Sequence, residues 1–452
     1  MRRLYIMKKR FLIIISAIVV MVTPIVAFAA DEPQTQPQVE VLTLDQCLQI
    51  AYENSKQLKS ADESVTIAKA NLTQAESNLF PTLSYSIAEL KYGIDYPLTG
   101  YGTTEGSYGY LFATQNLYTG GVTTGTIKVA KLSLTKALEE QRKAKQTLTY
   151  DVKSAYYQAW LSVQLLKVAQ ASYDNLGQHE QQMRVFYKAG TKSRYDLLQA
   201  QVNHEGQKPA WITAQNNLIL ANMKLATTIG VEEDRQITAS DDPSKVTIPQ
   251  SLEFEFQKLV EQAYHDRPEM RELKLADEIN TIQTQMAYAG YKPRVSLTAS
   301  MGGVGSTALD YKTKLGTDWT SDMTKDWVLL LNVTGNFFDG FKTPSAVTQG
   351  KATIKKAELD ESYTRDTMRL DVRQALQTIH GDLETIAASK AQIDLAKENL
   401  WMTQSRFHDG LSTNMDVLDA EFALDEASNS YYSSVSAYLT ALAKLDYVMG
   451  KD

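Results

Sequence analysis

Three segments of the chain alternate apolar residues with small polar ones. Leu, Tyr and Ile alternate with Thr and Ser over residues 82–87, and a similar alternation recurs over 295–301 and 329–337. A period of two residues predicts β-strands with one apolar face and one polar face. We therefore expect two β-hairpins, at about 82–118 and about 294–338.

The remaining pattern is helical and unusually long. In the second half of the chain, six apolar residues recur every seven positions: Val372, Ile379, Ile386, Ile393, Leu400 and Phe407. This 3.5-residue seam is typical of coiled-coil packing. A helix from about Ser345 to His408 would measure on the order of 90 Å at about 1.5 Å per residue. We expect it to end at Gly410 and a shorter helix to return from about Thr413 to Met449.

The first half of the chain repeats this plan. Residues 116–230 align with 336–450 at one constant offset, without an insertion. The identical pairs include Asn116 and Asn336, Gly120 and Gly340, Lys131 and Lys351, Asp174 and Asp394, Gly190 and Gly410, Asp196 and Asp416, and Gly230 and Gly450. This internal duplication predicts a first repeat at 42–230, whose long helical hairpin turns at residue 190, and a second at 253–450, whose hairpin turns at 410. A polar linker at 231–252 would join them.

The N-terminal segment has the order of a secretory signal peptide. A basic cluster at 8–10 precedes an apolar run at 11–22 and the small residues of Ala27-Phe28-Ala29. We assign residues 1–29 to a signal peptide and 30–41 to a flexible lead-in. Met1 and Met7 both remain possible starts. The mature chain is therefore expected outside the cytoplasm.

Net charge argues against nucleic acid as a partner. The net charge is −7, and the leader contains five basic residues, so the mature chain would carry −12. An acidic chain binds the phosphate backbone poorly. The single cysteine, Cys47, excludes an intramolecular disulfide. Cys47 also lies well downstream of the expected cleavage site, within a predicted helix, so we expect no lipid anchor.

Membrane insertion through helices is not expected, because no stretch after the leader has 18 consecutive apolar residues. The strands offer another route, but four strands cannot close into a barrel, and an open edge cannot lie in hydrocarbon. Several chains would have to share one barrel. Two chains would give eight strands with a filled interior, whereas three would give twelve around a water-filled pore. A water-soluble sheet with one packed face explains the alternation equally well.

The chain resembles the TolC family of outer-membrane efflux proteins over nearly its whole mature length. The resemblance rests on motifs that recur in order: Leu42-Thr43-Leu44-Asp45-Gln46, Leu79-Phe80-Pro81, Tyr291-Lys292-Pro293, Asn116 to Gly121, Asn336 to Gly340, and the segments around Gly190 and Gly410. It implies a mainly α fold with a small β part: long coiled-coil helical hairpins and four strands per chain. Three copies would form a twelve-stranded β-barrel in the outer membrane and an α-helical tunnel projecting into the periplasm.

The resemblance also implies partners. These would be two further copies of the chain, outer-membrane lipid, a periplasmic adaptor (membrane fusion) protein, and an inner-membrane pump of RND, ABC or MFS type. The adaptor would dock on the tips of the two helical hairpins, at Tyr187, Gly190, Thr191, Phe407, Gly410 and Leu411. The glycines also have a simpler explanation, because a left-handed glycine commonly ends a helix. Thr191 and Leu411 are better tests of docking, since the turn does not require them.

Three aspartates are candidates for the periplasmic entrance. By resemblance, Asp416 and Asp419 would form acidic rings around the trimer axis, and Asp196 would help to lock the entrance. Asp196 and Asp416 each follow a Ser or Thr by three residues, so either could simply cap a helix. Asp419 does not follow a Ser or Thr by three residues, so helix capping does not explain it.

The expected lock departs from the family pattern at one position. The resemblance places an arginine two residues after the second tip glycine, paired with the first-repeat aspartate, but this chain has Ser412 there. Lys192 and Arg194, beside Asp196, could substitute. Solvated charges at a helix start are the simpler interpretation of both.

No motif indicates an enzyme, a cofactor or a metal site. The five histidines, at 179, 204, 265, 380 and 408, are dispersed, without an i, i+4 pair. The resemblance implies a passive exit duct for drugs, other small molecules or polypeptides delivered by a pump. The alternative is a non-conducting trimeric spacer that tethers the outer membrane to the periplasm.

Overall fold

The computed structural model describes residues 40–96, 100–232, 237–240, 255–307 and 326–451. The signal peptide predicted at 1–29 lies outside these residues, as do most of the lead-in and much of the linker. Within the described part of the chain, no helix combines the length and the apolar character needed to cross a membrane.

Helices make up most of the structure. They are α2 (Leu44–Asn54), α3 (Lys56–Ser77), α4 (Val122–Lys188), α5 (Arg194–Ile229), α6 (Phe256–Asp266), α7 (Pro268–Ala287), α8 (Lys342–His408) and α9 (Asn414–Val448). A short 3₁₀ turn, η2 (Tyr288–Tyr291), follows α7. The predicted long helices are confirmed, and α8 begins slightly earlier than expected. Thr43 caps α2 in a capping box with Gln46.

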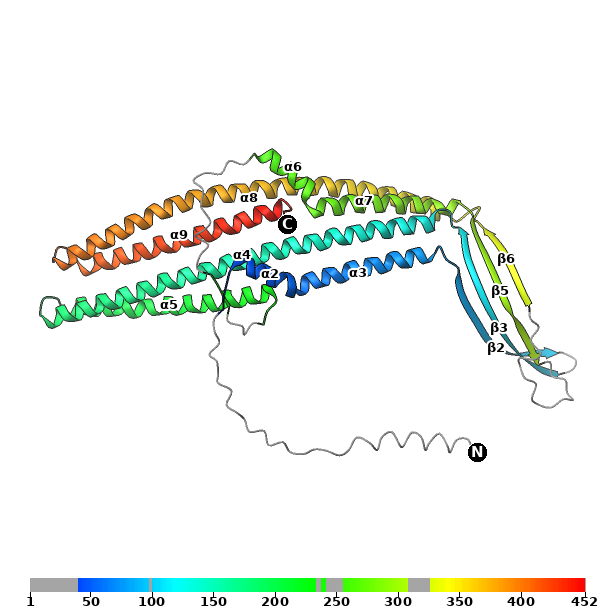
Figure 1. The fold of residues 1–452 in the computed structure, drawn as a ribbon, viewed down its shortest axis with the longest axis horizontal. Coiled ribbons are helices and arrows are strands. Elements are labelled where there is room, and N and C mark those ends of the chain that lie inside the picture. The colour runs from blue at the N-terminus through cyan, green and yellow to red at the C-terminus, as the bar shows by residue number, and fades with distance from the viewer. Residues whose placement is uncertain (1–39, 97–99, 233–236, 241–254, 308–325, 452) are drawn as a thin grey trace, which may run out of the picture. The chain divides into compact units, whose positions relative to one another are not determined.

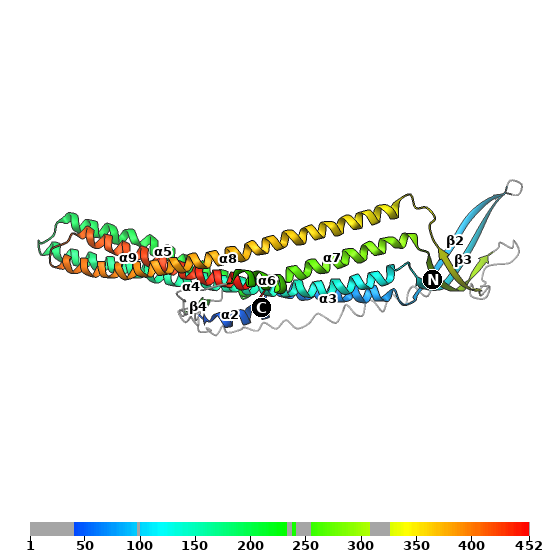
Figure 2. The same ribbon diagram turned by 90° about the horizontal axis from the view of Figure 1, so that it is seen from above.

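Two antiparallel helical hairpins, α4–α5 and α8–α9, lie side by side (Figure 1). Along its length α4 contacts α3, α5, α7 and α9, while α8 contacts α7 and α9. The packing order near the hairpin turns is therefore α5, α4, α9, α8. The turns lie at one end of the helices and the strands at the other (Figure 2).

The predicted seam of α8 is buried against its neighbours. Val372 and Ile379 are completely buried, and Ile386, Leu400 and Phe407 are nearly so. Ile393 is half-buried. The 3.5-residue period thus identified the core-facing side of α8.

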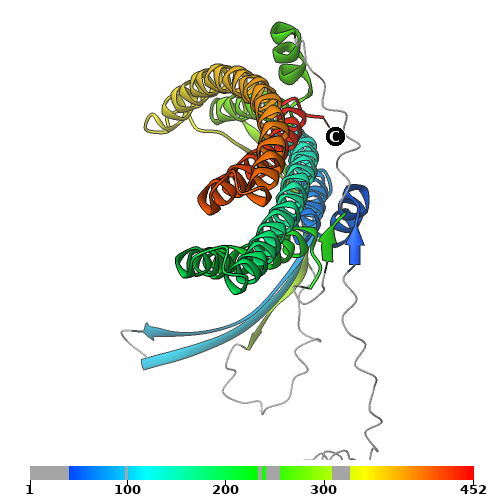
Figure 3. The same cartoon turned by 90° about the vertical axis from the view of Figure 1, so that its left-hand side faces the viewer.

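A large apolar core surrounds α2. Cys47 of α2, Val152 and Tyr156 of α4, Ile379 of α8 and Tyr438 of α9 belong to it. Burial raises the pKa of the Cys47 thiol to about 11, so the thiol stays protonated and packs as a small apolar side chain. We call this region the waist. Figure 3 shows α2 and α6 on the same side of the layer of long helices.

The larger sheet contains β2 (Thr82–Tyr96), β3 (Gly100–Tyr118), β5 (Arg294–Thr307) and β6 (Asp326–Thr334). Its order is β2-β3-β5-β6, and every neighbouring pair is antiparallel. Both predicted hairpins are present, and the β3–β5 pairing joins the two repeats. In the first hairpin, β2 and β3 fill almost the whole predicted range of 82–118. β6 ends at Thr334, so Phe337 lies beyond the strand.

The register gives this sheet two different faces. One row across the four strands is Leu83, Ala113, Ala299 and Leu329, and the next row on that face is Tyr85, Leu111, Met301 and Trp327. The opposite face includes Thr82, Ser84, Thr114, Ser296, Thr298, Ser300 and Asn332, interrupted by Phe112, Val328 and Leu330. The alternation read from sequence therefore produces one apolar face and one that is largely hydroxyl and amide.

A second, small sheet was not predicted. β1 (Glu40–Leu42) pairs in parallel with β4 (Ile237–Ala239), which lie in the segments assigned to the flexible lead-in and the polar linker. Leu42, Ile237 and Ala239 are buried in the waist. Three residues are too few to show a period of two, so tertiary packing decides their conformation.

Candidate functional site

The two hairpin turns share one hydrogen-bond pattern. Gly190 has φ +75°; its N–H donates to Tyr187 O at 3.0 Å, and the next N–H, of Thr191, donates to Phe186 O at 3.0 Å. At the second turn Gly410 has φ +76°, and Leu411 N–H donates to Arg406 O at 2.8 Å. This is the Schellman end of a helix, in which glycine adopts the left-handed conformation at least cost. The glycines therefore have a structural role whether or not an adaptor docks.

The predicted docking residues differ in accessibility. Leu411 is 69% exposed and Tyr187 42%, and Thr191 is exposed, although its Oγ1 donates to Phe186 O at 3.0 Å. Phe407 is only 3% exposed. In this chain Phe407 supports the turns from inside and does not offer a surface to a partner.

The structure brings the two turns together. Phe407 of α8 packs with Met183 of α4, Ala200 of α5 and Val417 of α9 in a small apolar cluster. Lys192 Nζ lies 4.7 Å from the centre of the Phe407 ring, a cation–π distance. Lys192, one of the two residues that we predicted could replace the missing arginine of the lock, thus lies over an aromatic ring of the other hairpin.

Asp196 and Asp416 both cap helices. The Asp196 carboxylate accepts from Ser193 N–H at 3.1 Å and Ser193 Oγ at 2.7 Å. The Asp416 carboxylate accepts from Thr413 N–H at 2.7 Å, and Asp416 N–H donates back to Thr413 Oγ1 at 3.2 Å. The bonds with Thr413, with a smaller contribution from the charge of Arg406, hold the pKa of Asp416 below its usual value. The Asp416 carboxylate therefore remains negative through the neutral range.

The other entrance candidates lie near these caps. Asp419 is exposed on α9, one residue past the first turn, and takes no part in the capping box. Ser412 Oγ donates to Thr403 O at 3.1 Å, so it fastens the turn to α8. Arg194 is exposed at the start of α5. A role in gating stays a prediction for all of them.

Sequence reasoning missed a buried polar contact above the turns. His179 of α4 pairs through Nε2 with Asn414 Oδ1 of α9, and Asn414 Nδ2 lies 3.5 Å from Gln199 Oε1 of α5. Burial lowers the pKa of His179. The sequence shows His179 only as an isolated histidine, because its partner is more than two hundred residues away.

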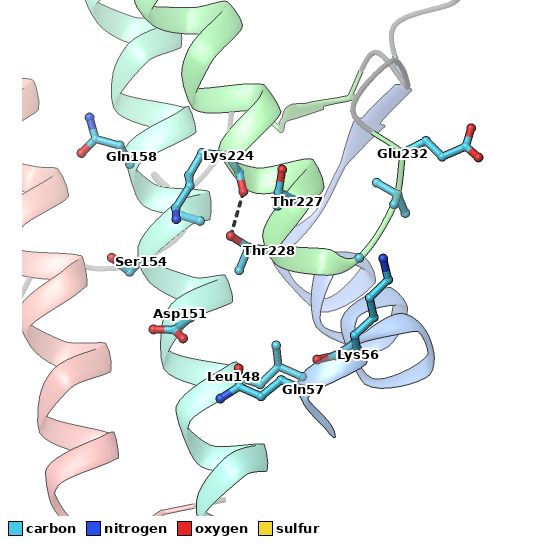
Figure 4. A pocket seen from close by; sticks show the side chains of 14 residues that line it. Lys56, Gln57, Leu148, Asp151, Ser154, Gln158, Lys224, Thr227, Thr228 and Glu232 are labelled. Carbon is cyan, nitrogen blue, oxygen red and sulfur yellow. Dashed lines mark hydrogen bonds between the residues drawn. The ribbon is translucent and has the colours of Figure 1, made fainter. Parts of the chain in front are cut away.

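A separate cavity lies far from the turns. It has a volume of about 840 Å³ and is formed where α3 begins, beside α4 and the end of α5. Figure 4 shows Lys56, Asp151 and Lys224 around it, with Thr228 Oγ1 donating to Lys224 O at 2.7 Å. Asp151 lies roughly 55 Å along α4 from Lys188, at about 1.5 Å per residue. Nothing in its lining connects it with the predicted entrance.

Comparison with known proteins assigns the family. A family model described as "Outer membrane efflux protein" matches residues 47–231 and 259–451. The chain belongs to the outer membrane efflux protein family. The two matched segments follow the duplication seen in the sequence, and the resemblance to TolC is confirmed. Members of this family are outer-membrane proteins, which gives the location of the chain.

Two curated relatives are similar over part of the chain. The alkaline protease secretion protein AprF of Pseudomonas aeruginosa is 24% identical over 324 residues, covering 69% of this chain and 63% of AprF. The outer membrane protein TolC of Salmonella enteritidis is 23% identical over 313 residues, covering 68% of this chain and 61% of TolC. The chain thus spans less than two thirds of the length of either relative.

A solved structure shows the same fold. A crystal structure of CusC superposes with a TM-score of 0.77 and 18% identity, covering 90% of this chain and 92% of CusC. Its title describes conformational changes that accompany folding and transmembrane channel formation. The long helical hairpins and the four-stranded sheet therefore form the same fold as CusC.

Proposed function

We propose that three copies of this chain form an exit duct in the outer membrane. The observation that carries the proposal is the four-stranded sheet: one face is apolar, the other largely hydroxyl and amide, and β2 and β6 each have one neighbour within the described sheet. An apolar face suits lipid and a polar face suits a water-filled interior. The two outer strands would pair with those of neighbouring copies, because an unpaired edge is costly in lipid.

The helices support the same assembly. In the packing order α5, α4, α9, α8, the two outer helices carry exposed apolar residues. On α8 these include Leu395 and Met402; on α5 they include Tyr195, Leu198, Val202, Ile219 and Leu220. Apolar stripes of this kind mark protein interfaces. We infer that α8 of one copy packs on α5 of the next and closes a helical tunnel.

The proposed duct is passive. Cargo and energy would come from an inner-membrane pump, and an adaptor would engage the exposed turns near Thr191 and Leu411. In the trimer Asp416 and Asp419 would place six carboxylates around one axis, which would attract cations and repel anions. The mature chain would start after a cleaved signal peptide without a lipid anchor, and its two repeats would be 42–230 and 253–450.

Single-channel conductance of the purified protein in a planar bilayer tests this proposal. We expect discrete cation-selective openings that lose their selectivity in Asp416→Asn/Asp419→Asn, because both ring charges are removed. Glu205→Gln, an exposed charge change on α5, is the matched control. A membrane-inserted trimer that never conducts, in either form, would reject the duct in favour of a tethering spacer.

Docking has its own test. Thr191→Asp and Leu411→Asp each place a charge on an exposed turn, so we expect export to be abolished while trimers still form. Export by intact cells and cross-linking of trimers would be measured in parallel. Normal export by both variants would remove the docking assignment and leave the conduction proposal intact.

A further inference from the structure

A second cavity, of about 550 Å³, lies between α4, α8 and α9 just above the turns. Its lining includes Glu421 of α9, Asn175 of α4, and Trp401, Gln404 and Phe407 of α8. A volume of this size suits a drug-sized molecule. It is distinct from the entrance aspartates, none of which lines it.

Glu421 is the unusual member of this lining. The residue is 4% exposed, and its carboxylate accepts from Asn175 Nδ2 at 3.3 Å and Gln404 Nε2 at 3.2 Å. Both donors are neutral, and the charged group that acts on Glu421 is Asp425, which is also negative. Burial, with that repulsion, raises the pKa of Glu421. A buried carboxylate is ordinarily paired with a cation, and the described lining of this cavity contains neither lysine nor arginine.

The two histidines of the lining do not supply that cation. His179 is buried and bonded to Asn414, and burial lowers its pKa, so it is neutral at neutral pH. His408 is exposed and lies 3.5 Å from Asp409. No described side chain of the lining therefore balances the negative charge of Glu421, and a positively charged ligand would do so.

The rest of the wall suits an organic cation. Trp401 lines the cavity and is 70% exposed, and the face of an indole ring attracts cations. Asn175 and Gln404 use their NH₂ groups to bind Glu421, so each keeps its carbonyl oxygen as an acceptor. Gln178 and Gln182 add two more amides. One carboxylate, one accessible indole ring and several amide oxygens match a flat aromatic ammonium better than a small metal ion, which needs several anionic ligands.

We propose that this cavity is a binding site for organic cations, held by Glu421 and Trp401. Binding of an organic cation at this site does not depend on the proposed duct function. Only the inference that the bound cation is cargo of the duct rests on that function. Binding can be measured at equilibrium, without conduction, so the two proposals can fail separately.

The test uses ethidium as the probe and the purified full-length protein in detergent. Fluorescence anisotropy should show saturable binding. Glu421→Gln keeps the side-chain size and removes the charge. Asn175 and Gln404 donate to different oxygens of Glu421, so the single oxygen of the glutamine keeps one of these two bonds. We expect it to weaken ethidium binding by about tenfold or more, as loss of a charge-assisted contact does. Glu426→Gln, an exposed charge change on the same helix, should leave the Kd within about twofold.

Two further measurements separate a binding site from a structural effect. Trp401→Ala should weaken ethidium binding several-fold while Trp401→Phe retains most of it, because the ring face is kept. Binding of the neutral probe N-phenyl-1-naphthylamine should be unchanged by Glu421→Gln. Equal ethidium affinity in the parent and Glu421→Gln, or parallel losses for the charged and neutral probes, would overturn the proposal.

Discussion

The waist and the hairpin turns use the same four long helices but pack them in different ways. At the waist, Val152, Ile379 and Tyr438 belong to a large apolar core that also takes in α2 and the β1–β4 sheet. Near the turns the apolar cluster is small, and His179, Asn414 and Glu421 fill the contact beside it. Apolar burial stabilises more than polar pairing, which only replaces bonds to water. The two helical hairpins are therefore held together more strongly at the waist than at the turns.

Polar bonds reinforce the waist as well. Arg267, between α6 and α7, lies 3.1 Å from an Asp371 oxygen of α8, and Arg142 of α4 donates to Asp266 O at 2.6 Å. Gln146 Nε2 donates to Gly450 O at 2.7 Å. These bonds tie α4, α8 and the end of α9 together where the apolar core is largest. Near the turns, hydrogen bonds from Asn175 of α4 and Gln404 of α8 to Glu421 tie the same three helices together, but they lie beside a much smaller apolar cluster.

The strongest test of this difference is Ile379→Ala at the waist. Ile379 is fully buried, so its truncation should destabilise the whole chain by about 2–5 kcal/mol. Thermal unfolding followed by circular dichroism should show a clear fall in Tm. Ile67→Ala, the same truncation at an exposed site on α3, controls for the loss of an isoleucine side chain. A melting temperature equal to that of the control would contradict the assignment of the waist as the stabilising region.

Phe407→Ala should act locally. The ring fills the only apolar cluster identified between the turns in the described chain, and a Phe→Ala change in a core costs about 3–5 kcal/mol. Because the waist holds the helices independently, we expect the main thermal transition to change little while amide exchange accelerates near the ends of α4 and α8. A single cooperative shift of the whole molecule would show that the turns and the waist unfold together.

Thr413→Ala should loosen the start of α9 by about 1 kcal/mol, because it removes the side chain that caps Asp416 N–H. Hydrogen exchange of residues 414–417 would measure it. Ser193→Ala makes the same change at the start of α5 and should speed exchange there by a similar factor. Unequal responses would mean that the two turns are not equivalent.

The smallest expected effect is the dependence of the turns on pH. Burial, then repulsion from Asp425, raises the pKa of Glu421, so its ionised form is the costly one and the contact gains stability as pH falls through that raised pKa. Burial lowers the pKa of His179 from 6.5, so the contact loses stability as pH falls below 6.5 and His179 is driven to protonate. Glu421→Gln removes the costly buried charge, so it should slow amide exchange at the turns at pH 7. In this variant only the destabilisation that comes from protonation of His179 at acid pH should remain. Acid stabilisation that persists in this variant would show that Glu421 is not its source.

Much of the fold follows from periodicity. The seven-residue seam identified the buried side of α8, and the alternation at 82–87 and 295–301 identified both hairpins. Local chemistry was also readable, since Ser193 and Thr413 predicted the caps that the structure shows. These features depend on neighbours a few residues apart.

The rest depends on contacts between distant residues. Glu421 and Asn175 come from different repeats, as do His179 and Asn414, and neither pair leaves a pattern in the sequence. Phe407 was expected at the surface of the turn because its place in the motif suggested docking, whereas its place in the heptad seam is what buries it. The seam was the better guide at that position.

The pairing of β1 with β4 has a consequence for biogenesis. Glu40 of β1 lies opposite Ile237 of β4. β1 can therefore pair only after the chain has been made as far as β4. Closing so long a loop is slow, and Leu42 remains without its final packing until then. Residues 40–42 should thus be among the last of the first repeat to gain protection during folding, although they are among the first to be synthesised. A chaperone that shields emerging chain would have most to do there.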